Sequence, residues 1–268
     1  MSSRIFRDGL LAGRVALVTG GGSGIGRGIA LGLAQQGAKL ALVGRTAQKL
    51  EAVAEEVRGV GSEAAVHALD VRDFDALQSA VNETAKVFGG LDIVVCSAAG
   101  NFIAPAASLS ANGFKAGIDI DLLGTFNTCR AAFEQLSVRG GSILSVTATQ
   151  AWVPTPLQCH AGAAKAGIAK LTQDLALEWG KSKVRVNAIA PGPIDDTEGM
   201  RRLAPTESGA REQLTAKMPV GRFGTVQEIA DLAVFLCSDA AGFITGTTIV
   251  ADGGQSLMGA TGFLEMMG

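Results

Sequence analysis

The chain has 268 residues, of which 47% are hydrophobic and 18% charged, and its formal net charge at pH 7 is −2. This length fits one well-filled α/β domain, and the near-neutral charge gives no electrostatic reason to expect a nucleic-acid partner. The mean hydropathy of +0.30 raises the question of a membrane span. Both uncharged windows, 93–114 and 140–164, are broken by proline, serine and amide residues, so neither is expected to cross a membrane.

The two ends and the cysteines indicate a cytoplasmic protein. Residues 1–14 contain no apolar run of signal-peptide length. The four cysteines are widely spaced, with no CxxC pair and no metal-ligand spacing, so we expect reduced thiols and no metal site. The last residues are not an S-K-L-type peroxisomal address.

Short, nearly continuous apolar runs alternate with helical patterns along the chain. Runs that are apolar throughout are typical of strands covered on both faces. The predicted strands are 15–18, 40–43, 64–69, 91–96, 142–146, 184–190 and 247–251. Between them, Ile25, Ile29 and Leu33 repeat at helical spacing, and Thr225 with Glu228 forms a capping box that opens a later helix.

This alternation predicts a single-domain, Rossmann-type, doubly wound α/β fold, with a seven-stranded parallel sheet and helices on both faces. No linker rich in proline, glycine or serine divides the chain. We therefore expect one domain over residues 12–256, with an N-terminal extension (1–11) and a C-terminal tail (257–268).

A glycine-rich turn directly follows the first predicted strand and precedes a helix. Gly20, Gly24 and Gly26 have the spacing G-x-x-x-G-x-G. Glycines in such a turn let the backbone approach a pyrophosphate, which then lies on the N-terminus of the helix. The second predicted strand ends in Gly44-Arg45. An arginine there suits a 2′-phosphate, whereas NAD would call for a carboxylate, so NADPH is favoured over NADH.

Over about residues 12–256, the chain resembles the short-chain dehydrogenase/reductase superfamily. The segments that carry the resemblance are T-G-G-G-S-G-I-G (19–26), Asp70-Val71, C-S-A-A-G (96–100), A-K-A (164–166), N-A-I-A-P-G-P-I (187–194) and A-D-G-G (251–254). From the glycine turn and the resemblance together, the residues expected at the cofactor are Gly20, Gly22, Ser23, Gly24, Ile25, Gly26, Arg45, Asp70, Val71, Ala98, Ala99, Gly100, Lys165, Pro191, Gly192, Ile194 and Thr197.

The family's Asn-Ser-Tyr-Lys tetrad is largely missing. The chain contains no tyrosine. Ala161 stands at the tyrosine position, Ala148 at the serine position and Asp121 at the asparagine position, and only Lys165 is retained. Ordinary alcohol or ketone chemistry needs a hydroxyl acid at the carbonyl, so these departures argue against it.

One branch of the superfamily shows the same departures, the 2,4-dienoyl-CoA reductases of the peroxisomal type. The resemblance implies NADPH-dependent reduction of a 2,4-dienoyl-CoA to a 3-enoyl-CoA, with Asp121 and Lys165 as the catalytic residues. It also implies a homo-oligomer, commonly a tetramer. The positions that it assigns to the acyl-CoA substrate are Arg72, Phe102, Ser110, Asn112 and Arg202.

Several alternatives stay open from the sequence. The substrate could be another acyl or carbonyl compound such as a 3-oxoacyl thioester, or the chain could bind NADPH without catalysis. Asp121, His160 or water could supply the proton. His160 adjoins the tyrosine position but points about 100° away from it around a helix. His67, inside a predicted strand, is expected to be a core residue.

Overall fold

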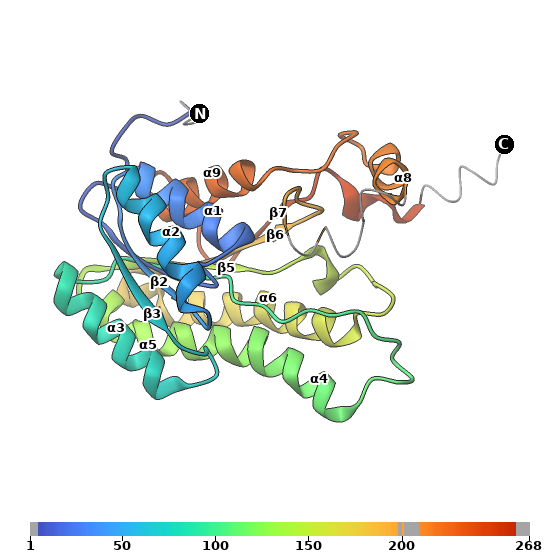
Figure 1. Ribbon diagram of the computed structural model, residues 1–268, viewed down its shortest axis with the longest axis horizontal. Helices are drawn as coiled ribbons and strands as arrows, with labels where there is room; N and C mark the ends of the chain where they lie inside the picture. The colour runs from blue at the N-terminus through green and yellow to red at the C-terminus, as the bar shows by residue number, and fades with distance from the viewer. Residues whose placement is uncertain (1–4, 198–199, 201–208, 261–268) are drawn as a thin grey trace.

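The computed structural model describes residues 5–197, Met200 and residues 209–260 (Figure 1). Seven parallel strands form one sheet in the order β3-β2-β1-β4-β5-β6-β7. The strands are β1 (Val15–Thr19), β2 (Lys39–Gly44), β3 (Ala64–Ala68), β4 (Ile93–Cys96), β5 (Gly141–Val146), β6 (Val184–Pro191) and β7 (Thr248–Ala251). The predicted fold class is confirmed, and each strand lies within two residues of its predicted bounds.

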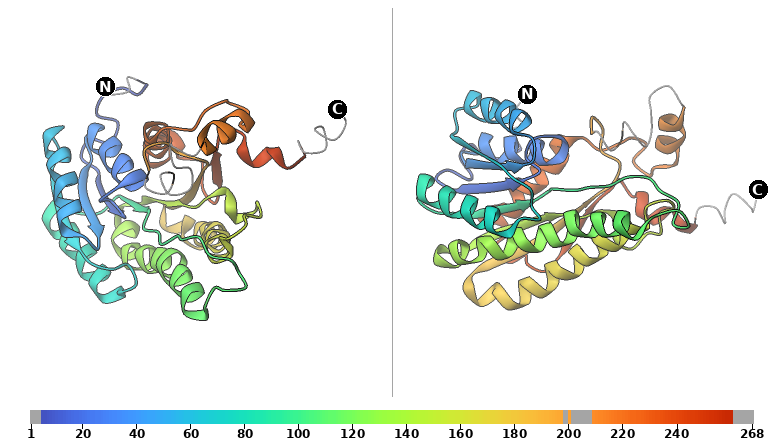
Figure 2. Two further views of the ribbon diagram at one scale, coloured as in Figure 1. Left: turned by 45° about the vertical axis from the view of Figure 1, so that its right-hand side comes forward. Right: turned by 60° about the horizontal axis from the view of Figure 1, so that its bottom comes forward.

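Helices cover both faces of the sheet. The helices on the first face are α1 (Gly24–Gln35), α2 (Ala47–Gly59) and α9 (Val226–Cys237), and those on the second are α3 (Phe74–Phe88), α5 (Gly124–Arg139) and α6 (Cys159–Trp179). Two short helices, α4 (Ala111–Ile118) and α8 (Ala210–Lys217), lie beyond the carboxyl edge of the sheet (Figures 1 and 2). No helix within the described part of the chain is long and apolar enough to cross a membrane.

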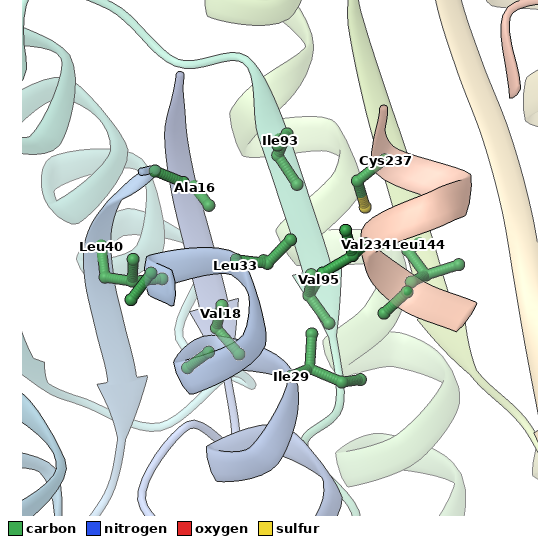
Figure 3. Close-up of a cluster of buried hydrophobic side chains, with 14 of the residues drawn as sticks. Ala16, Val18, Ile29, Leu33, Leu40, Ile93, Val95, Leu144, Val234 and Cys237 are labelled. Atoms are coloured by element: carbon green, nitrogen blue, oxygen red, sulfur yellow. The ribbon is translucent and has the colours of Figure 1, made fainter. Parts of the chain in front are cut away.

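Alternate side chains of each strand enter different cores, because successive residues of a strand point to opposite faces. Ala16 and Val18 of β1 face the core beneath α1 and α9, whereas Val15 and Leu17 face the core on the other side. Figure 3 shows the first core, where Leu33 of α1 lies among the strand side chains. Burying a leucine of this size stabilises a fold by about 1.5–3 kcal/mol.

The same two-sided burial explains why the predicted strands were apolar throughout. Helix α9 begins at the predicted capping box, in which Thr225 Oγ1 accepts from Glu228 N and the Glu228 carboxylate accepts from Thr225 N. The four cysteines are free thiols, as expected.

Candidate functional site

Two of the cavities at the carboxyl edge of the sheet lie next to its central strands. In the strand order, β1 lies between β2 and β4. The chain builds β2 and β3 on one side of β1, and then crosses back to build β4 and the later strands on the other side. Open α/β sheets bind their ligands at such a switch point. The first cavity lies at the ends of β1, β2 and β4 and has a volume of about 240 Å³. The second, of about 400 Å³, lies at the ends of β5 and β6.

The first cavity contains much of the predicted dinucleotide site. Its lining residues are Gly20, Gly22, Ser23, Gly44, Arg45, Thr46, Lys49, Leu50, Leu69, Asp70, Val71, Ala98, Ala99 and Ile120. Eight of the predicted cofactor residues are in this set. Lys49 was not predicted, although its place in the first turn of α2, four residues after Arg45, could have suggested it.

The glycine turn is tight because two of its residues could not carry a side chain. Gly20 has a φ of 67°, and a Cβ there would lie 2.6 Å from the carbonyl oxygen of Ser97. A Cβ on Gly26 would lie 2.3 Å from the carbonyl oxygen of Gly20. Helix α1 then begins after Ser23, whose side chain does not cap it. The free N–H groups of its first turn make this end attractive to an anion.

Asp70 and Arg72 form a close pair at the side of this cavity. The Arg72 guanidinium donates to both carboxylate oxygens, over 3.0 Å from Nε and 2.7 Å from Nη2. This hydrogen bonding holds the pKa of Asp70 below its usual range. Among the described residues that line the cavity are Asp70 and Val71 but not Arg72, so the predicted contact of Arg72 with CoA stays a prediction.

Asp121 and Lys165 form a buried ion pair between the two cavities. Lys165 Nζ lies 3.1 Å from Asp121 Oδ2 and donates to the Val146 carbonyl oxygen over 3.2 Å. Gly100 N donates to Asp121 Oδ1 over 2.7 Å. Ile120, next to Asp121, lines the first cavity, and Val146 lines the second. The two residues that the resemblance assigns to catalysis are therefore in direct contact.

Asp121 lies in a π-helical turn, η1 (Asp119–Leu123), between α4 and α5. Such turns are rare in proteins, and those that occur are often found at functional sites. Within the turn, Asp121 is 1% exposed, and Thr125 Oγ1 donates to its carbonyl oxygen. Asp119 instead pairs with Lys115 near the surface.

The second cavity combines apolar lining residues with a polar patch. Its lining residues are Ile25, Asn101, Val146, Thr147, Ala148, Thr149, Gln150, Thr155, Gln158, Pro191, Gly192, Pro193, Ile194, Thr197, Met200, Leu214 and Gln255. Five predicted cofactor residues belong to it, and so does Ala148 at the missing serine position. Ala161, at the missing tyrosine position, is buried.

Sequence reasoning missed a polar network in this cavity. Asn101 Nδ2 and Gln150 Nε2 both donate to Gln158 Oε1, over 2.5 and 2.8 Å. These residues come from three separate segments, and no local motif marks them.

Three of the predicted substrate residues meet at the start of α4, where the Phe102 ring and Ser110 Oγ both lie within 4 Å of the position that a Cβ on Gly113 would take, next to Asn112. Phe102 stacks on His160, with 4.2 Å between the ring centroids. Ser110 caps α4 by accepting from Gly113 N, and Asn112 is exposed in the first turn of that helix. Arg202 lies outside the described residues. His67 was expected in the core, but it is only partly buried, on the edge strand β3. It contacts Thr84 Oγ1 over 3.2 Å, and burial lowers the pKa of its imidazole.

Comparison with known proteins places this architecture in a family. A family model described as enoyl-(acyl carrier protein) reductase matches residues 20–256. The chain belongs to the short-chain dehydrogenase/reductase family of oxidoreductases. Within the described part of the chain, no cluster of histidine, cysteine and acidic residues could hold a metal ion.

Two curated relatives show how far the similarity extends. A peroxisomal 2,4-dienoyl-CoA reductase of Saccharomyces cerevisiae, named as producing (3E)-enoyl-CoA, is 43% identical over 95% of this chain and 88% of its own length. A probable 2,4-dienoyl-CoA reductase of Bacillus subtilis, named as producing (2E)-enoyl-CoA, is 42% identical over 91% of this chain and 97% of its own.

Two solved structures share the fold closely. The citronellol catabolism dehydrogenase of Pseudomonas aeruginosa has a TM-score of 0.83 and 40% identity, covering 94% of this chain and 98% of its own. A gluconate 5-dehydrogenase from Burkholderia cenocepacia, solved with NADP and tartrate, has a TM-score of 0.87 and 29% identity, covering 93% of this chain and 98% of its own.

Proposed function

We propose that the chain reduces 2,4-dienoyl-CoA thioesters with NADPH and releases a 3-enoyl-CoA. The observation that carries the proposal is the buried Asp121–Lys165 pair in a site where Ala148 and Ala161 replace the family's two hydroxyl residues. A site of this kind lacks the acid needed for alkoxide chemistry but can still polarise a conjugated thioester. The dienoyl-CoA reductases among the curated relatives support the same substrate class.

The residues of the first cavity suit NADPH. A glycine turn that a Cβ would block and an uncapped helix end would receive the pyrophosphate. Arg45 and Lys49, which line this cavity, would hold the 2′-phosphate. Lys165 lies outside its lining and would reach the nicotinamide ribose. When bound, NADPH supplies a hydride to the δ-carbon of the dienoyl group.

The remaining steps belong to the chain's own residues. Lys165 adds positive charge where the thioester oxygen becomes negative, and its contact with the Val146 carbonyl fixes the position of that charge. Gly100 N donates to Asp121 Oδ1, and the Lys165 ammonium faces Oδ2, which accepts no hydrogen bond from the described residues and is the oxygen that we expect to bind a water. We infer that this water protonates the α-carbon, which leaves the double bond at C3; protonation at the γ-carbon would leave it at C2.

The proposal also includes the assembly, the location and the substrate contacts of the protein. We expect a homo-oligomer of tetrameric type, with an acyl-CoA as its small-molecule partner and the cytoplasm as its location. Residues 12–256 would form the catalytic domain. Arg72, Phe102, Ser110, Asn112 and Arg202 remain the proposed substrate contacts.

The decisive experiment measures NADPH oxidation and diene loss separately, with 2,4-hexadienoyl-CoA as substrate. We expect both signals to fall together and the isolated product to be the 3-enoyl thioester. Asp121→Asn should reduce turnover by about 10²- to 10⁴-fold while NADPH affinity is largely retained, since that is the usual contribution of acid–base groups.

Other outcomes would support the alternatives. Efficient turnover of a 3-oxoacyl thioester or a simple secondary alcohol, with none of the diene, would contradict the proposal. NADPH binding with no turnover of any thioester would favour a catalytically silent protein.

A further inference from the structure

Helix α8 forms part of the wall of the second cavity, but packing does not hold it there. Its Leu214 lines the cavity, together with Ile194 and Thr197 of the loop after β6. None of residues 211–216 is buried, and α8 lies apart from the helices that cover the sheet (Figure 1). Most helices in folded proteins are stabilised by an apolar face packed against a core. The position of α8 therefore depends on polar contacts.

Arg211 makes the contacts that tie α8 to the rest of the molecule. Its Nη1 donates to Asp195 Oδ1 over 2.8 Å, and its Nη2 donates to Asp195 Oδ2. The same guanidinium lies over the ring of Phe223, 4.8 Å from the centroid, and Phe223 is buried. Two parallel hydrogen bonds fix the orientation of a guanidinium as well as its position. They also lower the pKa of Asp195, so its carboxylate stays charged at neutral pH.

The two partners of this guanidinium are themselves joined. Asp195 N donates to the Gly224 carbonyl oxygen over 2.8 Å, and Gly224 N donates to the Pro193 carbonyl oxygen over 3.0 Å. Ile194 and Gly224 form a parallel bridge. A Cβ on Gly224 would lie 2.7 Å from Ile194 Cδ1, so the glycine allows the two segments to approach this closely. Asp195 and Phe223 therefore form a fixed base for α8.

The side chain that binds this base and the side chain that lines the cavity share one side of α8. Arg211 and Leu214 are three residues apart, a spacing that brings side chains to the same side of a helix. Asp195 in turn lies between Ile194 and Thr197, which line the same cavity. A shift of α8 that broke the ion pair would therefore carry Leu214 away from the cavity.

We propose that Arg211 is a positioning residue for the substrate: by binding Asp195 and Phe223 it holds Leu214 as an apolar wall against the acyl group. The inference rests on the proposed function, which supplies an acyl-CoA. Contact with Leu214 favours binding because it removes apolar surface of the acyl group from water. The wall acts equally before and during the chemical step, so its effect falls on KM and not on kcat.

The first test needs no substrate. Hydrogen exchange of the α8 backbone amides, followed by mass spectrometry, measures how readily the helix opens. Arg211→Gln and Asp195→Asn should each speed this exchange by about 3- to 10-fold, the scale of a partly exposed but bidentate ion pair. Arg58→Gln is the matched control, because Arg58 is similarly exposed and pairs with Glu51 and Glu55 on α2. Unchanged exchange of α8 in both test variants would overturn the proposal.

The second test separates substrate binding from chemistry. With 2,4-hexadienoyl-CoA and saturating NADPH, Arg211→Gln should raise KM by about 3- to 10-fold and leave kcat nearly unchanged. Arg211→Lys keeps the charge but not the planar fork, so it should recover only part of the lost affinity. Arg58→Gln should change neither constant. A fall in kcat with an unchanged KM in Arg211→Gln would contradict the proposed role.

A double-mutant cycle then links Arg211 to Leu214. Leu214→Ala alone should raise KM, because it removes apolar contact with the acyl group. In the Arg211→Gln background the same change should have little further effect, since Leu214 has already left its place. Additive effects of the two changes would mean that Arg211 does not act through Leu214, and would overturn the proposal.

These outcomes separate the inference from the proposed function. If the wild type turns over no dienoyl-CoA, the function is wrong, and hydrogen exchange still decides whether Arg211 holds α8. If the wild type is active and Arg211→Gln speeds the exchange of α8 without raising KM, the helix is held by Arg211 but does not position the substrate, and the inference is wrong.

Discussion

At the scale of single residues, cofactor choice depends on the charges beside the first cavity. Arg45 and Lys49 both line it, and no acidic residue at the end of β2 offers a partner for a ribose 2′-hydroxyl. A guanidinium binds a phosphate through two parallel hydrogen bonds, whereas an ammonium acts as a point charge. Arg45 should therefore contribute more than Lys49.

Replacing Arg45 tests this difference. Arg45→Ala should weaken NADPH binding by about 1.5–3 kcal/mol, the scale of a hydrogen bond to a charged group, and should leave NADH binding nearly unchanged. Lys49→Ala should have a smaller effect in the same direction. Fluorescence titration of each variant with NADPH and with NADH measures these changes in affinity. An equal loss for NADPH and NADH, or a wild type that prefers NADH, would exclude a 2′-phosphate site at Arg45.

The residues of the site differ in how visible they are in the sequence. Asp121, Ala148, Ala161 and Lys165 stand at recognisable positions, so their departure from the family tetrad can be identified without a structure. The burial of His160 cannot be identified from the sequence, because the ring that stacks on it, Phe102, comes from a loop almost sixty residues earlier in the chain. The network of Asn101, Gln150 and Gln158 is also invisible in the sequence, since no local motif shows that these three side chains hydrogen-bond one another.

At the scale of elements, hydrophobic periodicity predicts strands and long helices well but not irregular turns. The seven strands lie within two residues of the predicted positions. The five central strands are buried on both faces, whereas the edge strands β3 and β7 are only partly buried. The π turn Asp119–Leu123 is invisible to the same reasoning. It is five residues long, and a helical pattern reads through it without interruption. Yet this turn carries Asp121.

The capping box of α9 gives a prediction about stability and pH. Arg222 hydrogen-bonds Glu228, and with Thr225 N it lowers the pKa of the Glu228 carboxyl from its usual 4.5 to about 2. A carboxyl whose pKa is lower in the folded state contributes stability that is complete above pH 4.5 and lost as the pH falls toward 2. Because the side chain is 47% exposed, solvent screening limits this contribution.

Glu228→Gln should therefore lower the free energy of unfolding by about 0.5–1 kcal/mol at pH 7, the usual scale of a cap. The difference from wild type should shrink steadily below pH 4.5. Denaturant titrations between pH 7 and pH 3 measure it. Glu134→Gln, on an exposed face of α5 with Arg130 3.9 Å away, is the control and should show little effect at any pH. A difference for Glu228→Gln that does not vary with pH would contradict the assignment.

At the scale of the whole molecule, the strand order brings distant segments to one edge of the sheet. The glycine turn after β1, Arg45 after β2 and the loop after β4 surround the first cavity, and the ends of β5 and β6 form the second. The alternation of strands and helices predicts parallel strands with both faces covered. It does not determine the order β3-β2-β1-β4-β5-β6-β7, because crossovers in either direction have the same local pattern.

The homo-oligomer that we propose needs a surface for contact between copies, and several large apolar side chains are left exposed. Phe114, Leu123 and Phe126 are each about 40% exposed along α4, η1 and α5, which follow one another without a break. Leu123 and Phe126 are three residues apart, so they lie on one side of this helical rod and form an apolar stripe. Large exposed apolar patches on soluble proteins usually mark interaction sites. The stripe lies beside η1, so an interface there would also support the turn that holds Asp121.

Charge placed in this stripe should break the expected oligomer. Phe126→Glu would bury an unpaired carboxylate in the interface, so sedimentation equilibrium should show a smaller species than the wild type. Val138→Glu is the matched control: Val138 is 76% exposed on the same helix, about 120° further round, and its replacement should leave the mass unchanged. A wild-type monomer would exclude assembly altogether. An intact oligomer in Phe126→Glu, or dissociation in Val138→Glu alone, would move the interface to another face.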